Sequence, residues 1–143
     1  MAENGQDGKL TVRLVTPDRV LLDATADAVE LPSASGYLEA LYGAAPLLAE
    51  LGAGEVRLHG GTSGDQRFFV ARGFVEVLPE QVTILAEKAM HPEEIDRARA
   101  EEEKQRGEKM WAEAGDDGAR YDEANEIKRE AEAEVASAEG KGL

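Results

Sequence analysis

The sequence predicts a mostly β N-terminal sandwich of about ten antiparallel strands, followed by an α-helical antiparallel hairpin. One observation is alternation, since Val75, Val77, Val82 and Ile84 alternate with polar neighbours. This period of two is typical of strands with one buried face. The other is the change after His91, where the chain becomes charged, alanine-rich and helical in its spacing. We therefore place a β-sandwich domain at residues 1–88 and a two-helix hairpin domain at residues 89–143.

The predicted strands are short runs of β-forming residues with turn residues between them. The segment Thr16-Pro17-Asp18 is typical of a turn, because proline fixes φ and aspartate can bond its own backbone. Many short strands with no helix between them favour an antiparallel sandwich or a flattened barrel. We expect strands at 9–15, 20–22, 28–31, 37–41, 47–51, 55–59, 68–72, 73–78 and 81–86.

The second domain is expected to form helices from Pro92 to about Ala114 and from about Ala119 to Ala138. Gly107 falls inside the first helix, where glycine costs about 1 kcal/mol relative to alanine. Few large apolar side chains are available to hold the helices together, so we expect the hairpin to be the part that moves. The second helix carries a seam of mostly small side chains at helical spacing: Ala124, Ile127, Ala131, Val135 and Ala138.

The charge of the chain is strongly negative. The formal net charge of −14 divides into −6 for residues 1–90 and −8 for residues 91–143. Such a polyanion repels nucleic acid and anionic lipid, so we expect neither as a partner. The chain has no cysteine, which excludes disulfides, and no apolar run approaches the roughly 20 residues that span a bilayer. The first residues resemble no signal peptide, so we expect a soluble protein without direct membrane insertion.

Four stretches, taken in order, carry a resemblance to a known family. They are VTPDR at 15–19, GYL at 36–38 with APLL at 45–48, GFVEV at 73–77 with VTILAE at 82–87, and IDRARA at 95–100. Together they resemble the epsilon subunit of F-type ATP synthases, which is called delta in mitochondria. The resemblance extends from Leu10 to about Ala138. Each stretch alone is weak evidence for the family. The four stretches occur in the family's order, and the change from sandwich to hairpin falls where the family has it, so the resemblance as a whole is specific.

The resemblance implies a non-catalytic central-stalk (rotor) subunit of a proton-translocating ATP synthase. The sandwich would join the gamma subunit to the ring of c subunits, the c-ring. The hairpin would regulate ATP hydrolysis by extending toward the catalytic alpha/beta head, as it does in many bacteria. The implied location is the cytoplasmic face of the bacterial plasma membrane, as a peripheral part of the complex. ATP would be a regulatory ligand, and no other cofactor is implied.

The resemblance also implies that the segment from Tyr37 to Pro46 contacts the c-ring. The residues of this rotor-ring interface would be Tyr37, Leu38, Tyr42 and Ala44. Exposed tyrosines near a tight corner suit an interface. The alternative is an ordinary hairpin corner whose glycine and proline serve only the turn. The family usually has the sequence PGHAP here, whereas this chain has YGAAP at 42–46 and so lacks the histidine.

A nucleotide site is implied at Ile95, Asp96, Arg99 and Ala100, which match a motif that binds ATP in some relatives. An arginine near a helix start can offer a two-pronged fork to phosphate. The alternative is a surface pair of Asp96 and Arg99, worth about 0.2–0.5 kcal/mol. The second helix often carries basic residues in the family, but residues 119–139 have three basic and seven acidic side chains, a net charge of −4.

We identify no catalytic residue and no metal ligand in the sequence. His59 and His91, the only histidines, fall in different domains and are expected at exposed loop positions. No phosphate-binding glycine loop or nucleophile elbow is present. Trp111 and Met110 are expected to pack either inside the hairpin or against a neighbouring subunit. The competing function is a free-standing β-sandwich adaptor that binds a soluble protein partner through its helices.

Overall fold

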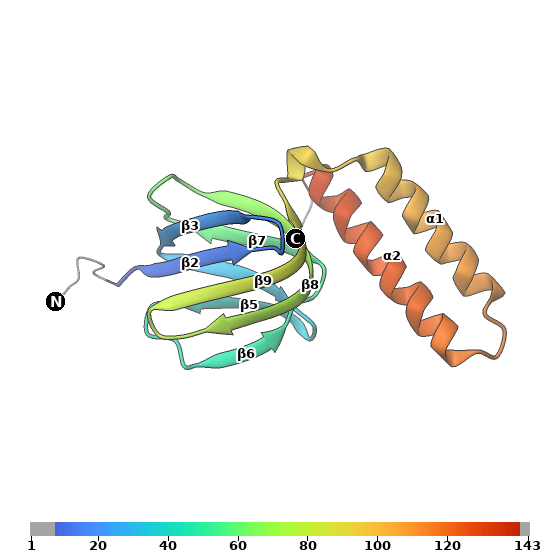
Figure 1. Cartoon of the computed structure of the whole chain (residues 1–143), viewed down its shortest axis with the longest axis horizontal. Helices are drawn as coiled ribbons and strands as arrows, with labels where there is room; N and C mark the ends of the chain where they lie inside the picture. The colour runs from blue at the N-terminus through green and yellow to red at the C-terminus, as the bar shows by residue number, and fades with distance from the viewer. Residues whose placement is uncertain (1–7, 141–143) are drawn as a thin grey trace. The chain divides into compact units, whose positions relative to one another are not determined.

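The structure is a computed structural model that describes residues 8–140 of the 143-residue chain. The chain divides into two units, of which the first ends at His91 and the second begins at Pro92 (Figure 1). The last strand of the first unit runs to Met90, two residues beyond the predicted boundary at residue 88. We describe each unit separately.

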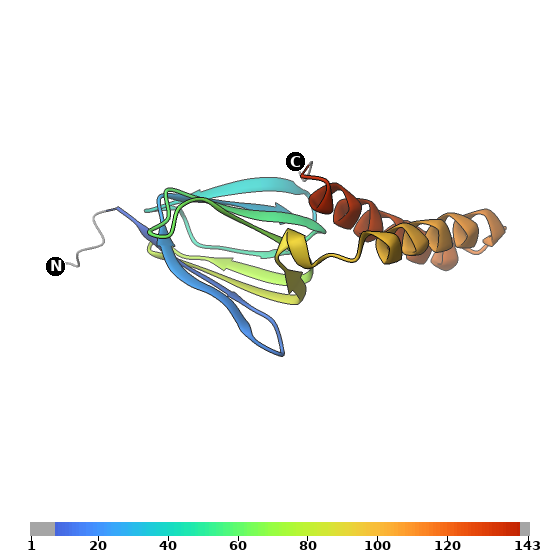
Figure 2. The ribbon, with the colours of Figure 1, turned by 90° about the horizontal axis from the view of Figure 1, so that it is seen from above.

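The first unit is a β-sandwich, as the alternating pattern predicted. Its strands form one continuous hydrogen-bonded sheet in the order β3-β2-β9-β8-β7-β4-β5, and β6 also pairs with β8. The sheet folds into two layers, which Figure 2 shows from above. The described residues form eight strands: β2 Leu10–Val15, β3 Val20–Ala26, β4 Ala28–Ser33, β5 Gly36–Leu41, β6 Leu47–Glu50, β7 Gly54–His59, β8 Gln66–Val77 and β9 Gln81–Met90.

Two details differ from a sandwich of about ten antiparallel strands. The runs predicted at 68–72 and 73–78 form the single strand β8, because the backbone bends at their junction without leaving the sheet. β2 also pairs with β9 in parallel, whereas the other strand pairs are antiparallel. The first and last of the described strands of this unit therefore lie side by side.

The core lies between the two layers and is built from alternate residues of each strand. Leu10, Val12 and Leu14 of β2 are fully buried there, as are Val82 and Ile84 of β9. Full burial of a side chain of this size contributes roughly 1.5–3 kcal/mol relative to exposure. The core holds most of the sandwich's apolar side chains, so it supplies the main stabilisation of the first unit.

Strand β8 changes the face it turns to the core at Arg72-Gly73. Before this point Phe68 and Val70 point into the core, and after it Val75 and Val77 do, so the alternation shifts by one residue. Arg72 and Gly73 have positive φ angles of 62° and 132°, a conformation that local strand geometry does not favour. The shift turns the exposed side chain of Phe74 outward, because Val75 takes the inward position.

The bend also lets β8 serve both layers of the sandwich. β8 pairs with β7 as far as Val70 and with β6 from Phe74 onward. Between these two pairings, the backbone N–H of Leu51 donates to the carbonyl of Gly73 at 2.9 Å. A Cβ atom at Gly73 would lie 2.0 Å from the carbonyl oxygen of Leu85. Only glycine fits here, because both the φ angle and the approach of β9 exclude a side chain.

The second unit is an antiparallel helical hairpin, as predicted. It consists of a short 3-10 helix η1 at Pro92–Glu94, the helix α1 at Arg97–Glu113 and the helix α2 at Gly118–Ala138. The first helix was predicted to begin at Pro92, but α1 begins five residues later. Asp96 caps it, because its side chain accepts a hydrogen bond from the backbone N–H of Arg99 at 3.1 Å. Asp117 caps α2 in the same way.

The two helices pack through small residues. Ala100 and Gly107 of α1 are buried, as are Ala124, Ala131 and Ser137 of α2. A Cβ atom at Gly107 would lie 2.7 Å from Cγ of Lys128 and 3.1 Å from Cγ2 of Ile127. The sequence indicated only a helix-propensity cost at Gly107, but the structure shows that the missing side chain allows α2 to approach. Arg97 and Glu139 form an ion pair across the open end of the hairpin.

We predict that Gly73→Ala destabilises the sandwich more than Gly36→Ala does. Gly36 has a φ of 129°, almost equal to that of Gly73, but a Cβ atom there would meet nothing within 4 Å. The backbone strain of about 1–3 kcal/mol is therefore common to both variants. Only Gly73→Ala adds overpacking, which costs about 1–3 kcal/mol more. Chemical unfolding of the full chain measures the difference, and equal losses of stability would show that the approach of β9 is not a constraint.

Candidate interaction surfaces

A row of apolar side chains, four exposed and Val15 half-buried, crosses the outer face of one layer. The strand register places Val20 opposite Val15, Val15 opposite Leu85, and Leu85 opposite Phe74, and paired residues point to the same face. Phe74 is 54% exposed and Leu85 55% exposed. Leu48 of β6, which is diagonal to Phe74 in the register, is 72% exposed. We call these five residues the outer apolar row. A contiguous set of exposed apolar side chains marks an interaction site.

The sequence indicates this row by two pairs of adjacent apolar residues, which the search for alternation overlooked. Phe74 precedes the core residue Val75, and Leu85 follows the core residue Ile84. At this point β8 and β9 are apolar on the core face and on the outer face, because Phe74 and Leu85 are directly paired on the outer face. A strand that is apolar on both faces indicates a second surface that becomes covered.

A second group of exposed apolar side chains lies at one end of the sandwich. The N–H of Gly43 donates to the carbonyl of Pro79 at 2.7 Å, so the turn after β5 is fastened to the turn between β8 and β9. Leu41, Tyr42 and Leu47 are about half exposed, and Leu78 is 36% exposed. Gly43 has a φ of 86°, which lets the chain turn sharply at this corner. We call Leu41, Tyr42, Leu47 and Leu78 the end patch.

The predicted rotor-ring residues do not form one cluster. Tyr37 is the second residue of β5, and Tyr42 follows its last residue. Five residues of extended chain separate the two tyrosines by about 17 Å. Both tyrosines are partly exposed, at 40% and 45%, whereas Leu38 and Ala44 pack against the core. Of the four residues, only Tyr42 therefore belongs to the end patch.

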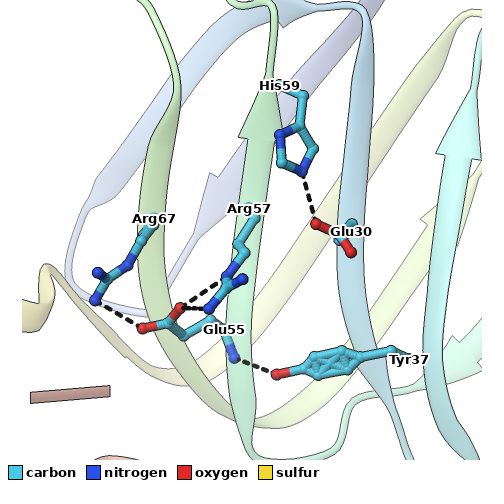
Figure 3. Close-up of polar contacts among 6 residues, drawn as sticks. All are labelled: Glu30, Tyr37, Glu55, Arg57, His59 and Arg67. Atoms are coloured by element: carbon cyan, nitrogen blue, oxygen red, sulfur yellow. Dashed lines mark hydrogen bonds and ion pairs between the residues drawn. The ribbon is translucent and has the colours of Figure 1, made fainter. Parts of the chain in front are cut away.

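The other layer carries a polar network on its outer face, drawn in Figure 3. The carboxylate of Glu55 on β7 is fully buried and accepts from Nε of Arg57 and from Nη2 of Arg67, both at 2.9 Å. The two arginines are directly paired between β7 and β8, so the carboxylate also offsets the repulsion between them. Only the carboxylate is fully buried, since the side chains of Arg57 and Arg67 are 21% and 39% exposed. Losing one arginine therefore costs less than the roughly 3–5 kcal/mol typical of a fully buried ion pair.

Tyr37 of β5 joins this network, and His59 forms a separate contact with Glu30 of β4. The hydroxyl of Tyr37 accepts from the backbone N–H of Glu55 at 2.9 Å, and burial raises the pKa of this phenol above its usual value. Nε2 of His59 lies 2.6 Å from a carboxylate oxygen of Glu30. His59 ends β7 and so is not the loop residue that was predicted, while His91 packs against Phe68 with ring centroids 5.0 Å apart. The sequence held no signal for burial of Glu55, since an acidic residue in a strand normally indicates solvent exposure.

The predicted nucleotide motif forms the start of α1. Ile95 is half-buried, and its N–H donates to the carbonyl of Pro92. Asp96 uses its carboxylate in the helix cap, Ala100 is buried, and the side chain of Arg99 is exposed. The interaction between Asp96 and Arg99 thus runs through the arginine's backbone N–H. Among the four residues, only Arg99 offers a side-chain donor to solvent.

Residues 8–140 contain no group of three or more His, Cys, Asp or Glu side chains that could hold a metal ion. Neither α1 nor α2 is long and apolar enough to cross a bilayer.

A β-sandwich that exposes groups of apolar side chains, joined to a helical hairpin, is typical of a protein that binds other proteins. Comparison with known protein families identifies the family to which the chain belongs. Residues 9–92 match the family described as ATP synthase, Delta/Epsilon chain, beta-sandwich domain. The chain therefore belongs to the delta/epsilon chains of ATP synthase, as the four sequence stretches indicated.

Individual relatives agree with this assignment. The chain is 45% identical over 103 residues to the ATP synthase epsilon chain of Koribacter versatilis, covering 71% of each protein. It is 35% identical over 133 residues to the ATP synthase epsilon chain of Microcystis aeruginosa, covering 92% of this chain and 96% of the relative. The second match includes the hairpin as well as the sandwich.

Two solved structures have the same fold. A chain of the mitochondrial ATP synthase of Euglena gracilis matches with a TM-score of 0.71 and 21% identity, covering 88% of this chain and 81% of that one. A chain of the central stalk and c-ring of the Tetrahymena thermophila enzyme matches with a TM-score of 0.62 and 16% identity, covering 91% and 96%.

Proposed function

We propose that the chain is a central-stalk subunit of a proton-translocating F-type ATP synthase and that it joins the gamma subunit to the c-ring. It would lie at the cytoplasmic face of a bacterial plasma membrane, as a peripheral part of the complex. Membership of the delta/epsilon family supports this proposal. The observation that carries it is the outer apolar row, which leaves Phe74 and Leu85 exposed side by side on a rigid layer.

The outer apolar row is our proposed contact with gamma. Its side chains are fixed on strands that continue into a fully buried core, so little conformational freedom is lost when a partner covers them. The opposite layer is less suited to this contact, because its outer face holds the ion-paired side chains of Glu55, Arg57 and Arg67. A partner there would have to desolvate charges that are already paired.

The end patch is our proposed contact with the c-ring. Tyr42 anchors it, and Ala44 would fix the corner from the core side. Leu38 lies in the first half of β5 and would act only by holding that strand against the core. Tyr37 lies at the other end of β5 and would contact the ring only if the interface extends along the whole strand. The patch is apolar and bounded by backbone-bonded turns, so it offers a stiff surface for transmitting torque.

We predict that Leu85→Glu abolishes binding of purified gamma and that Ser63→Glu does not. The new charge at Leu85 would be buried against the partner, whereas Ser63 is exposed in the loop before β8. Both variants should unfold at the same temperature as the wild type, because neither side chain is in the core. Calorimetric titration measures the affinity, and wild-type affinity of Leu85→Glu would exclude the outer apolar row as the gamma contact.

A variant of the end patch separates the two contacts. Tyr42→Asp is expected to bind gamma as the wild type does and to lower proton-driven ATP synthesis in reconstituted vesicles. The reason is that a charge in the end patch weakens the hold on the ring without reaching the outer apolar row. Unaltered synthesis by Tyr42→Asp would refute the ring contact proposed here.

We also propose that ATP binds at Arg99 and that the bound hairpin stays folded. Support comes from the exposed guanidinium of Arg99 near the start of α1, where the helix dipole also favours phosphate. In the assembled enzyme the hairpin would then extend toward the alpha/beta head when ATP is scarce and slow ATP hydrolysis. A form of the chain ending at His91 should raise the ATPase rate of the assembled head, and an unchanged rate would contradict this role.

We predict that millimolar ATP gives a binding heat with the full chain and that Arg99→Gln removes it. Arg120→Gln is the matched control, because Arg120 is also exposed in the first turn of a helix. Isothermal calorimetry with magnesium present and absent makes the measurement. No heat with the wild type, or equal heat with both variants, would dispose of nucleotide binding at Arg99.

A further inference from the structure

The hairpin presents one large apolar side chain to solvent, Trp111, near the end of α1. Trp111 is 46% exposed, and every other large hydrophobic residue described in the second unit is more deeply buried. Tyr121 of α2 meets the indole edge-on, with ring centroids 5.4 Å apart and planes at 71°. Contact with a residue of the other helix fixes the orientation of the indole, so the exposed ring is a preformed surface.

A cation already lies over this ring. Nζ of Lys128 is 5.8 Å from the centroid of the indole, within the distance at which a cation is attracted to the face of a tryptophan. The stem of Lys128 packs against Gly107, so the side chain is held between the helices by its aliphatic part. The ammonium group can therefore leave the ring without separating α1 from α2.

The segment that contains Trp111 and the turn between α1 and α2 is strongly acidic. Residues 108–123 carry six acidic and two basic side chains, a net charge of −4, and all eight are exposed. This field repels acidic protein surfaces, nucleic acid and anionic lipid, and it attracts cations. The charge and the aromatic ring therefore select the same kind of partner group, because tryptophan is the aromatic residue that binds cations best.

We propose that Trp111 and the surrounding carboxylates form a docking surface for a basic protein segment that places an arginine on the indole. A guanidinium stacks on an aromatic face and donates several hydrogen bonds to carboxylates at the same time. The arginine displaces the ammonium of Lys128, which returns to solvent. This surface belongs to the second unit, whereas the outer apolar row and the end patch belong to the first, so it would add a partner beyond the gamma and c-ring contacts proposed above.

An octa-arginine peptide and the full-length chain test this proposal. Trp111 is the chain's only tryptophan, so intrinsic fluorescence reports on this ring alone. We expect the peptide to change the emission of Trp111 at low salt, and octa-glutamate to leave it unchanged. Peptide binding without any change in emission would overturn the proposal, as would an absence of binding.

Matched variants separate the ring from its charged surroundings. Trp111→Leu should weaken binding of a labelled octa-arginine peptide about fivefold, the size of an exposed cation–π contact. Tyr42→Leu, which removes a side chain of similar exposure in the first unit, should not change the affinity. Equal affinities of wild type and Trp111→Leu would show that charge alone attracts the peptide.

A second pair of variants tests the proposal without changing Trp111, in case Trp111→Leu destabilises the hairpin. Lys128→Gln and Lys109→Gln each remove one positive charge from the hairpin, but only Lys128 lies over the indole. Lys128→Gln should therefore increase the affinity more than Lys109→Gln does, with the helix content of both unchanged by circular dichroism. Equal affinities of the two variants would contradict displacement of Lys128 from the ring.

Discussion

The bend of β8 at Arg72-Gly73 is the constraint on which the first unit depends. Before the bend, the even-numbered residues Phe68 and Val70 face the core. Without the bend the even-numbered residues after it would also face the core, and Phe74 would point inward. The two positive φ angles shift the alternation by one residue and let one strand pair with β7 and then with β6. The same backbone distortion thus closes the sandwich and turns an aromatic side chain out beside Leu85.

The two units are stabilised by different interactions. In the sandwich, large side chains such as Phe68, Leu58 and Ile84 are fully buried, each contributing roughly 1.5–3 kcal/mol. In the hairpin the buried residues are small, and the remaining contacts include the Arg97–Glu139 ion pair and the exposed indole of Trp111. Exposed ion pairs contribute at most about 1 kcal/mol. We therefore expect the sandwich to be the more rigid unit and the hairpin to open more easily.

Much of the fold could be predicted from the sequence, because alternation and helical spacing are local patterns. The strands and the two helices fall in this class, but the start of α1 at its cap Asp96 was not predicted. The parallel pairing of β2 with β9, the burial of Glu55 and the role of Gly107 could not, since each depends on residues distant in the sequence. Of the residues on the candidate surfaces, Tyr42 was named through the family resemblance, whereas Leu85 and Phe74 emerged only once the register placed them side by side.

Side-chain footprinting of the chain with and without purified gamma tests the central claim most directly. Hydroxyl radicals oxidise exposed Phe, Leu and Tyr side chains, and mass spectrometry locates the modified residues. Our account predicts that Phe74, Leu85 and Leu48 lose their reactivity in the complex, while Tyr37 on the opposite layer keeps it. Protection of Tyr37 with Phe74 and Leu85 still fully reactive would show that gamma binds the other face and that the outer apolar row has another purpose.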